Sequence, residues 1–427
     1  MKNILATATG KAVIGFSSKT NVGSGSTWPG HIALKLNKNF ISEVLNRSKT
    51  KVIIVAGTNG KTTTGRLITS IVRENGKTYL QNKAGANLLN GLASAIVKGS
   101  SLNSKLSQDY LVFECDEYAL PLVLKQVKAD YVICLNLFRD QLDRYGEIDS
   151  IAKKWKKAFE KLNKSTTLIL NADDPEISYL GEKSKAKVFY FGLDETSELN
   201  SLKHGADSIH CPKCGHKLLY KTVYFSHLGD WKCPNCGLGR PKLDISNLGF
   251  HPLVGTYNKY NTLAAYLFGK AEKISDARIK SAFKTFTPAF GRQEELIYKG
   301  KKVQLFLSKN PTSFNESMHT ITTLGGKNFL ILLNDRIPDG LDVSWIWDIG
   351  FERILPGESN IAVSGDRVYD IALRLKYAGF FTHVDENPES ILNKMVDQLT
   401  ENETLYILPN YSAMLDIRKV ITGKKLL

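Results

Sequence analysis

Two hydrophobic patterns alternate along the N-terminal half of the chain. Short runs of consecutive apolar residues occur at 51–56, 111–113, 131–135 and 168–170. Between them, apolar residues recur every three or four positions; the segment after the first run carries Leu67, Ile68, Ile71 and Val72. The first pattern is typical of buried strands and the second of amphipathic helices. Because strands that alternate with helices form parallel sheets, we expect an α/β fold with a mostly parallel sheet covered by helices.

The pattern changes twice further along the chain. From about 196 to 245 it gives way to Ser, His, Gly and closely spaced cysteines, and helical periodicity resumes at 258–268. A second series of apolar runs follows at 329–333, 361–363 and 404–408. We therefore expect two α/β domains. The first covers residues 1–295, with an N-terminal extension and an insertion at about 205–242, and the second is a Rossmann-like domain at 296–427.

Composition and charge narrow the class of protein. The 427 residues are 42% hydrophobic and 23% charged, as in soluble globular proteins. No apolar run reaches the ~18–20 residues that span a membrane, and the apolar stretches near the N-terminus are short, so we expect a mature soluble segment. The net charge is +15, but lysines are spread along the chain, which argues against a nucleic-acid partner. A phosphate-rich substrate, an anionic membrane surface and plain solubility remain compatible with this charge.

Four of the six cysteines form two Cys-x-x-Cys pairs separated by 18 residues: Cys211, Cys214, Cys233 and Cys236. This is the spacing of a zinc ribbon, in which two tight turns present four thiolates to Zn²⁺. Gly215 and Gly237 directly follow the pairs and fit such turns. Two disulfides are the less favoured alternative, because the chain carries no export signal. Since cysteine fills all four positions, we expect a closed, structural site. Cys115 and Cys134 lie in apolar runs and are expected to be buried thiols.

A glycine-containing loop follows the first predicted strand and leads into a helix. Its residues are Gly57, Thr58, Asn59, Gly60, Lys61, Thr62 and Thr63. Backbone N–H groups at a helix N-terminus attract phosphate, Lys61 can reach the terminal phosphates of a nucleotide, and Thr62 can contact Mg²⁺. A standard P-loop would have glycine where Val55 stands. We interpret the loop as a nucleotide-binding variant of the P-loop; a surface turn is the alternative.

The loop resembles the nucleotide loop of the Mur ligase superfamily, which includes the folylpolyglutamate synthases. Further elements in the family's order are Glu114 in FECDE, the NADDP turn at 171–175, Gly255-Thr-Tyr-Asn258 and Gly291-Arg292-Gln-Glu294. The resemblance implies binding of ATP and Mg²⁺. It implies that Glu114 binds magnesium, that Asn258 meets the adenine, and that Arg292 approaches the phosphates.

The chain also departs from the ligases that add amino acids. Gln141 stands where those enzymes commonly have a metal-holding histidine, so a second metal ligand is not assigned. Residues 307–311 lack the acidic residue that usually opens the C-terminal domain. These departures, the four-cysteine insertion and the segment 334–345 resemble the MurT family, the ligase subunits of lipid II isoglutaminyl synthases.

This resemblance implies a reaction and a partner. The reaction is ATP-dependent amidation of the D-glutamate α-carboxylate in the lipid II stem peptide to D-isoglutamine, through an acyl phosphate. The ammonia would come from a glutaminase subunit (GatD-like) in a heterodimer, because this chain has no cysteine in an elbow-like turn. We therefore expect a cytoplasmic protein at the inner face of the plasma membrane.

Two residues are the candidate catalytic groups. Lys61 would stabilise the transferred phosphoryl group, and Asp342 would orient the partner's catalytic histidine as the third member of a triad. Asp335 and Asp339 lie in the same stretch, and the alternative interpretation of all three is a solvated acidic turn.

Two other functions remain open. One is a Mur-type or folylpolyglutamate-type ligase that joins an amino acid; Gln141, the altered segment 308–311 and the ribbon count against it. The other is a zinc-ribbon NTPase that acts on nucleic acid, which the dispersed basic residues disfavour.

Overall fold

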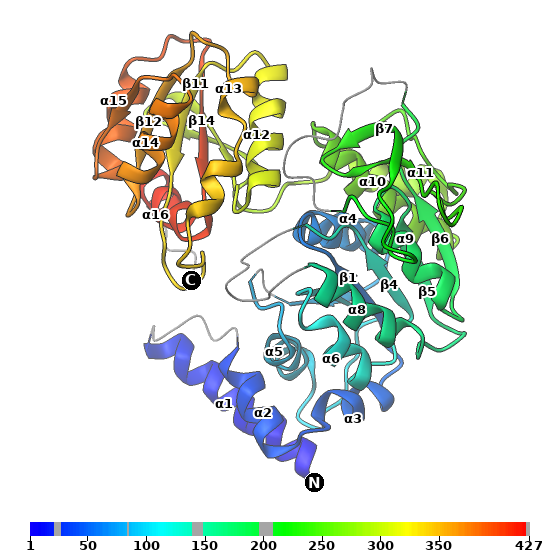
Figure 1. The fold of residues 1–427 in the computed structure, drawn as a ribbon. Coiled ribbons are helices and arrows are strands. Elements are labelled where there is room, and N and C mark those ends of the chain that lie inside the picture. The colour runs from blue at the N-terminus through cyan, green and yellow to red at the C-terminus, as the bar shows by residue number, and fades with distance from the viewer. Residues whose placement is uncertain (21–26, 83–84, 139–147, 196–207, 424–427) are drawn as a thin grey trace. The chain divides into compact units, whose positions relative to one another are not determined.

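The computed structural model describes residues 1–20, 27–82, 85–138, 148–195 and 208–423. The chain divides into two compact units. The N-terminal unit lies within residues 1–138, 148–252 and 258–286, and the C-terminal unit comprises 253–257 and 287–423. Figure 1 shows the elements of each unit, which are described separately below.

The N-terminal unit is built on a six-stranded sheet of order β2-β3-β1-β4-β5-β6, in which every pair of neighbours is parallel. Its strands are β1 (Lys51–Ala56), β2 (Tyr79–Gln81), β3 (Tyr110–Cys115), β4 (Tyr131–Cys134), β5 (Thr167–Asn171) and β6 (Lys187–Phe191). Every residue of β3 and β4 is buried, as expected for inner strands of a parallel sheet. The predicted parallel sheet is therefore confirmed.

Helices surround this sheet. They are α1 (Lys2–Thr20), α2 (Trp28–Leu36), α3 (Phe40–Asn46), α4 (Lys61–Glu74), α5 (Leu89–Gly99), α6 (Leu120–Gln126), α8 (Ile148–Phe159), α9 (Pro175–Lys183), α10 (Thr256–Ala271) and α11 (Asp276–Lys284). Helix α4 packs on α11, whereas α6, α8 and α9 pack in a row, and α1 and α2 pack together on α5. No helix in the described part of the chain is long and apolar enough to cross a membrane.

An antiparallel hairpin interrupts the unit between β6 and α10. It consists of β7 (Leu219–Phe225) and β8 (Leu228–Lys232) and lies between the two Cys-x-x-Cys pairs. Its small core joins Trp231 and Leu218 to Cys211 and Cys233, and Tyr179 of α9 packs against it. The insertion is thus anchored to the parallel sheet through α9.

The C-terminal unit contains a second six-stranded sheet, of order β13-β12-β11-β14-β10-β9. Its strands are β9 (Arg292–Tyr298), β10 (Lys301–Phe306), β11 (Asn328–Leu332), β12 (Asn360–Ser364), β13 (Thr382–Val384) and β14 (Thr404–Pro409). Only β9 is antiparallel to its neighbour. The apolar runs at 329–333, 361–363 and 404–408 are β11, β12 and β14, so this second α/β series is also confirmed.

Two hydrophobic clusters cover the second sheet. The helical elements are α12 (Pro311–Thr323), η1 (Ser344–Asp348), α13 (Phe351–Ile354), α14 (Val368–Tyr377), α15 (Pro388–Asp397) and α16 (Tyr411–Thr422). One cluster includes Phe314, Phe351 and Leu375, from α12, α13 and α14. The other includes Met395 and Ile417, from α15 and α16. The unit therefore has helices on both faces of its sheet.

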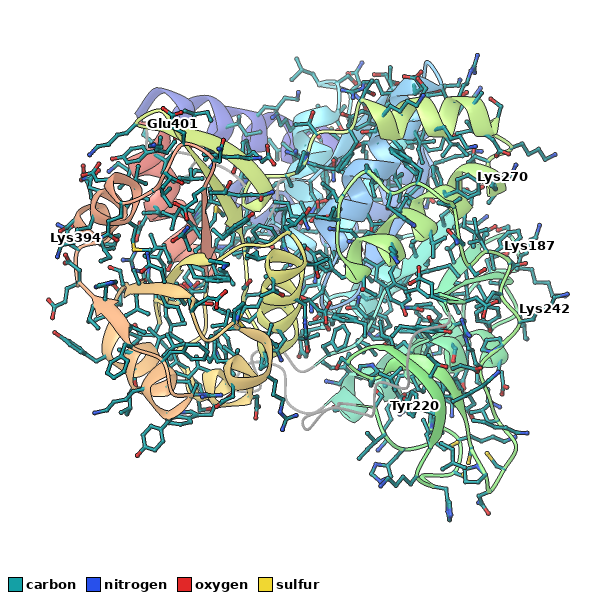
Figure 2. The ribbon with its side chains drawn as sticks, turned by 90° about the horizontal axis from the view of Figure 1, so that it is seen from above. Lys187, Tyr220, Lys242, Lys270, Lys394 and Glu401 are labelled. Carbon is teal, nitrogen blue, oxygen red and sulfur yellow. The ribbon has the colours of Figure 1, made fainter. Side chains whose placement is uncertain are left out.

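The positive charge is dispersed over both units. Figure 2 shows lysine side chains extending outward at many points, among them Lys187, Lys242, Lys270 and Lys394. All four are exposed. This distribution agrees with the absence of a single basic block in the sequence.

Candidate functional site

The loop after β1 requires its two glycines. Gly57 has φ +137° and Gly60 has φ +89°, a backbone region that other residues rarely adopt. A Cβ added at Gly60 would lie 2.2 Å from Oδ1 of Asn261 on α10. Helix α4 begins directly afterwards at Lys61, so its first N–H groups face the loop. The strand, glycine turn and helix N-terminus are arranged as the sequence predicts.

The segment after β4 holds this loop in place. The backbone N–H of Thr58 donates to the carbonyl oxygen of Asn136 at 3.0 Å, and the N–H of Asn59 donates to Asn136 Oδ1 at 2.8 Å. In return, the N–H of Phe138 donates to Thr58 Oγ1 at 3.0 Å. Strands β1 and β4 are neighbours in the sheet. The strand that follows β1 in sequence, β2, lies on one side of this pair, and the strand that follows β4, β5, lies on the other. Open α/β sheets bind ligands at the carboxyl ends of two strands where the strand order reverses in this way.

Lys61 is folded back over its own loop. Its ammonium donates to the carbonyl oxygens of Gly57 and Thr58 and lies 3.2 Å from Glu117 Oε2. The side chains of Lys61 and Glu117 are 10% and 5% exposed, so water screens this ion pair little. The indole Nε1 of Trp155 donates to the carbonyl oxygen of Glu117 at 2.7 Å and fixes the segment that carries it.

Thr62 and Glu114 meet beside the loop. The hydroxyl of Thr62 donates to Glu114 Oε2 at 2.8 Å, and Gln81 Nε2 donates to Glu114 Oε1 at 3.1 Å. Glu114 lies near the end of β3, next to β1, and is 4% exposed. A hydroxyl and a carboxylate are hard oxygen ligands of the kind that Mg²⁺ prefers. The structure therefore brings together the two residues that the sequence linked to magnesium.

Helix α10 reaches the same loop. The hydroxyl of Thr64 donates to Asn261 Oδ1 at 3.2 Å, and Asn261 Nδ2 donates to Asn258 Oδ1 at 3.1 Å. Asn258 and Asn261 are 1% and 2% exposed. Asn258 is thus linked to helix α4 through one intervening side chain. Thr63, the last residue of the predicted loop, is also buried.

The four cysteines of the insertion form one cluster. All four Sγ atoms lie within 4.8 Å of one another, at 3.6 Å between Cys211 and Cys236 and 3.5 Å between Cys214 and Cys233. These distances exclude disulfide bonds and approach the about 3.8 Å between sulfurs that share a tetrahedral Zn²⁺ at 2.3 Å. None of the four cysteines is disulfide-bonded.

The two cysteine turns have the same backbone geometry. Gly215 donates its N–H to the carbonyl oxygen of Cys211, and Gly237 donates to that of Cys233; both glycines have φ +73°. The backbone N–H of His216 is the main cause that lowers the pKa of Cys214 to about 6, which favours a thiolate. The donor set and its geometry fit a closed Zn²⁺ site.

In the C-terminal unit, Asp342 is exposed and precedes η1. Its Oδ1 accepts the N–H of Ser344 at 2.8 Å and its Oδ2 accepts the Ser344 hydroxyl at 3.0 Å. The backbone N–H of Ser344, followed by its hydroxyl, holds the pKa of Asp342 below its usual value. Asp342 is therefore an ionised carboxylate with a fixed orientation at the surface of the unit.

The other two carboxylates of that segment have internal partners. Asp335 forms an ion pair with Arg367 at 3.1 Å. Asp339 is 9% exposed and accepts hydrogen bonds from the N–H and hydroxyl of Ser412 at the start of α16. They hold the segment in place, whereas the exposed Asp342 accepts its hydrogen bonds from Ser344, two residues further along the chain.

Arg292 also belongs to the C-terminal unit. It begins β9 directly after Gly291, whose φ is +67°. Glu294 Oε2 accepts the N–H of Gly291 at 2.9 Å, and Arg418 of α16 forms an ion pair with Glu294 at 2.9 Å. The glutamate of the G-R-x-E element thus fixes the turn that presents Arg292.

Two family models match the chain: the Mur ligase middle domain at residues 55–269 and the MurT ligase C-terminal domain at residues 307–414. The MurT subunit of the lipid II isoglutaminyl synthase (glutamine-hydrolyzing) of Staphylococcus aureus (strain COL) is 33% identical over 372 residues, which cover 83% of this chain and 83% of that protein. The MurT subunit of Streptococcus pneumoniae (strain ATCC BAA-255 / R6) is 31% identical over 431 residues, which cover 95% and 94% of the two chains. The chain belongs to the MurT family of Mur ligases.

Solved structures agree with this family at the level of the fold. A pseudomurein peptide ligase type C from Methanothermus fervidus matches with a TM-score of 0.67 at 21% identity, covering 89% of this chain and 80% of that one. MurF ligase from Thermotoga maritima, solved in complex with ADP, matches with a TM-score of 0.62 at 13% identity, covering 91% and 83%. The predicted Mur ligase-like fold is confirmed.

Reasoning from the sequence missed several residues of this MurT-family site. Glu117, the partner of Lys61, lies three residues beyond Glu114 in the same FECDE segment, which was the available signal. Asn136 belongs to no sequence motif. It contacts the loop because β4, which it follows, lies beside β1 in the sheet. Gln141, which stands where the ligases that add amino acids commonly have a histidine, lies outside the described residues.

Proposed function

We propose that this chain is the ATP-dependent ligase subunit of a lipid II isoglutaminyl synthase. It would amidate the α-carboxylate of D-glutamate in the lipid II stem peptide to D-isoglutamine, with ammonia from a glutaminase subunit. The observation that carries the use of ATP is the convergence of Lys61, Thr62 and Glu114 at the loop after β1. Similarity to named MurT subunits over most of the chain supports the substrate.

The reaction needs two steps because a carboxylate is a poor acyl donor. A carboxylate oxygen of the substrate attacks the γ-phosphorus of ATP, and the bond between this phosphorus and the oxygen that bridges it to the β-phosphate breaks. ADP departs, and the substrate becomes an acyl phosphate. Ammonia then attacks the acyl carbon, the carbon–oxygen bond to phosphate breaks, and inorganic phosphate and a proton are released with the amide. The charge that develops in the first step is what the protein must stabilise.

The loop residues have distinct roles in this proposal. The N–H groups at the start of α4 cradle the phosphates, and the ammonium of Lys61 exchanges its two carbonyl partners for phosphate oxygens. Thr62 and Glu114 would hold Mg²⁺, which supplies positive charge at the phosphates. Asn258 would contact the adenine, and Arg292 would add positive charge at the phosphates. We propose the loop as a non-standard P-loop on these grounds.

The four-cysteine cluster is proposed to be a zinc ribbon. Its four sulfurs fill a tetrahedral set, so no position remains for a water or a substrate, and the role of Zn²⁺ would be to fold the insertion. This agrees with the small core around Trp231, which is too limited to order the hairpin by burial alone.

The partner proposal rests on Asp342 and on the family. Among the three carboxylates of its segment, Asp342 alone is exposed, and each of its oxygens keeps a lone pair beyond its contact with Ser344. Such a carboxylate can accept the Nδ1–H of a histidine in a glutaminase subunit and complete a triad there. The division into an ATP-binding domain (1–295) with a ribbon (about 205–242) and a partner-binding domain (296–427) stays a prediction.

We also propose that the protein works in the cytoplasm at the inner membrane face, where a lipid-linked substrate would lie. Residues 1–42 contain five lysines and no acidic residue. Leu5 of α1 and Trp28 of α2 are 58% and 67% exposed, so apolar and basic groups occur together on these helices. This combination suits an anionic lipid surface.

Product analysis with the purified chain tests the proposal. We expect ATP turnover to require lipid II, and amide formation to proceed with ammonium chloride alone or with glutamine plus the glutaminase subunit. Turnover that requires a free amino acid and joins it to the substrate would replace the proposal with a Mur-type or folylpolyglutamate-type ligase. Turnover stimulated by DNA or RNA would refute both.

A further inference from the structure

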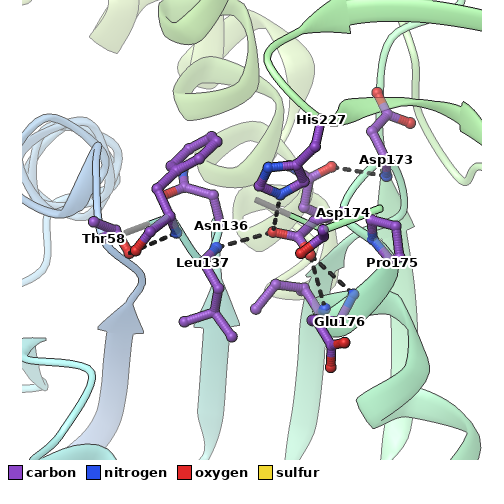
Figure 3. A network of polar contacts seen from close by, with 12 residues as sticks. Thr58, Asn136, Leu137, Asp173, Asp174, Pro175, Glu176 and His227 are labelled. Carbon is purple, nitrogen blue, oxygen red and sulfur yellow. Dashed lines mark hydrogen bonds and ion pairs between the residues drawn. The ribbon is translucent and has the colours of Figure 1, made fainter. Parts of the chain in front are cut away.

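The hairpin of the cysteine insertion places a histidine inside the N-terminal unit. His227 lies in the turn between β7 and β8 and is fully buried. Its Nε2 is 3.4 Å from Asp174 Oδ2 (Figure 3). Its ring packs against that of Phe138, with 4.8 Å between the ring centroids. Phe225, which precedes the turn, contacts the same Phe138 ring at 5.4 Å. The tip of the hairpin therefore touches the segment that anchors the glycine loop.

Asp174 is the junction of this contact. Its Oδ1 accepts the N–H groups of Glu176 and Ile177 at 3.0 and 3.2 Å and so caps helix α9. Its Oδ2 accepts the N–H of Leu137 at 2.9 Å and faces His227. Figure 3 shows the carboxylate between the histidine and the strand ends. A helix cap needs only the first oxygen, so the second is available for the contacts with Leu137 and the insertion.

Leu137 stands between the two residues that hold the glycine loop. Asn136 bonds to Thr58 and Asn59, and Phe138 bonds to the hydroxyl of Thr58. The backbone between them is fixed at Leu137 by Asp174. His227, Asp174 and the backbone of residues 136–138 therefore connect the hairpin to the loop, through two hydrogen-bonded contacts of Asp174 and those of Asn136 and Phe138. The side chains of His227, Asp174, Asn136, Phe138 and Thr58 are buried.

The hairpin is itself held firmly on the turn that carries Asp174. Gly229 donates its N–H to the carbonyl oxygen of Asp173 at 3.1 Å, and Trp231 Nε1 donates to that of Ala172 at 3.0 Å. Arg240, just beyond the second cysteine pair, forms an ion pair with Asp173 at 2.7 Å. A Cβ at position 229 would lie 2.1 Å from a backbone oxygen of β7, so the close approach requires glycine.

From these contacts we propose that the four-cysteine insertion positions the nucleotide loop. His227 is a positioning residue that orients Asp174, which fixes the 136–138 backbone and thereby Thr58 and Asn59. The cysteine cluster orders the hairpin that carries His227. The inference deepens the proposed function and rests on it, since it assumes that the loop binds ATP.

The test compares ATP binding in variants of the insertion. His227→Phe keeps a ring against Phe138 and removes the hydrogen bond to Asp174. We expect its Kd and KM for ATP to rise about 3- to 10-fold, which corresponds to one lost hydrogen bond, while kcat changes less. His227→Gln, whose amide can donate to Asp174, should recover part of the affinity. His216→Phe, at an exposed histidine of the same insertion, should leave Kd unchanged.

Trp231→Phe separates positioning from simple stabilisation. It removes the bond to Ala172 and leaves Asp174 untouched, so we expect a lower thermal midpoint with a Kd for ATP within about two-fold of the unsubstituted protein. An unchanged Kd in both His227 variants would overturn the inference. So would an equal loss of ATP affinity in the Trp231 and His227 variants, because only stability would then be involved. Absence of ATP binding by the unsubstituted protein would instead refute the proposed function.

Discussion

The ion pair between Lys61 and Glu117 gives a prediction with separate readouts for stability and activity. At 3.2 Å, an ion pair in a medium of effective dielectric about 20 has a Coulomb energy of about 5 kcal/mol. Burial of both groups offsets part of this energy, but removing one partner from a buried pair costs about 3–5 kcal/mol. We therefore expect Lys61→Ala to destabilise the protein by about 3–5 kcal/mol, because it removes the ammonium that neutralises Glu117.

A double-mutant cycle isolates that interaction. Glu117→Gln combined with Lys61→Ala should recover about 2–4 kcal/mol of stability relative to Lys61→Ala alone. The measurement is urea or thermal unfolding, in which about 1 kcal/mol shifts the midpoint by about 2–4 °C for a unit of this size. ATP turnover should stay abolished in both variants that lack Lys61, since the nucleotide loses its cation.

Lys51 provides the matched control. Its ammonium lies 2.8 Å from Glu272, but the lysine side chain is 49% exposed and Glu272 also accepts hydrogen bonds from Tyr110 and Tyr131. Lys51→Ala should therefore cost at most about 1 kcal/mol. If Lys61→Ala is no more destabilising than Lys51→Ala, or if the double variant is no more stable than Lys61→Ala, the reasoning is wrong.

Three further changes have defined outcomes. Cys211→Ser should release bound zinc, measured by metal analysis, and lower the thermal midpoint; full activity and an unchanged midpoint without bound metal would contradict a structural zinc site. Asp342→Asn should stop glutamine-dependent amidation while ammonia-dependent amidation and ATP turnover continue, and unchanged use of glutamine would exclude the triad role. Hydrogen bonds from the backbone N–H and hydroxyl of Thr78 lower the pKa of Asp109 from 3.8 to about 2. The stability that Asp109 contributes is therefore present above about pH 4 and is lost as the pH falls towards 2, so Asp109→Asn should flatten the change of the thermal midpoint over that window.

Local sequence patterns predict much of the fold and the loop. The run 51–56, the glycines at 57 and 60 and the lysine at 61 lie next to one another in sequence, so their geometry follows from local rules. The two Cys-x-x-Cys pairs are similarly self-contained, and their turns form as the spacing predicts.

Contacts between distant segments are not predictable in this way. Asn136 contacts the loop because β4 is placed beside β1, and His227 contacts Asp174 because the hairpin packs on α9. Neither residue belongs to a motif, and a buried histidine in an insertion is indistinguishable by sequence from one exposed on its surface, such as His216. The short strands β2 and β13, of three residues each, also lack a periodic signal.

The position of β1 at the centre of its sheet has a consequence for synthesis of the chain. Lys51 pairs with Tyr110, and Ile53 pairs with Tyr131, so both neighbours of β1 are translated long after it. At about 5–20 residues per second, roughly 4–16 s pass between the end of β1 and the end of β4. Until β3 is complete, the apolar segment Val52–Ala56 has neither of its neighbouring strands to pair with and must avoid other unpaired strands. The strand that leads into the glycine loop is thus among the most aggregation-exposed parts of the nascent chain.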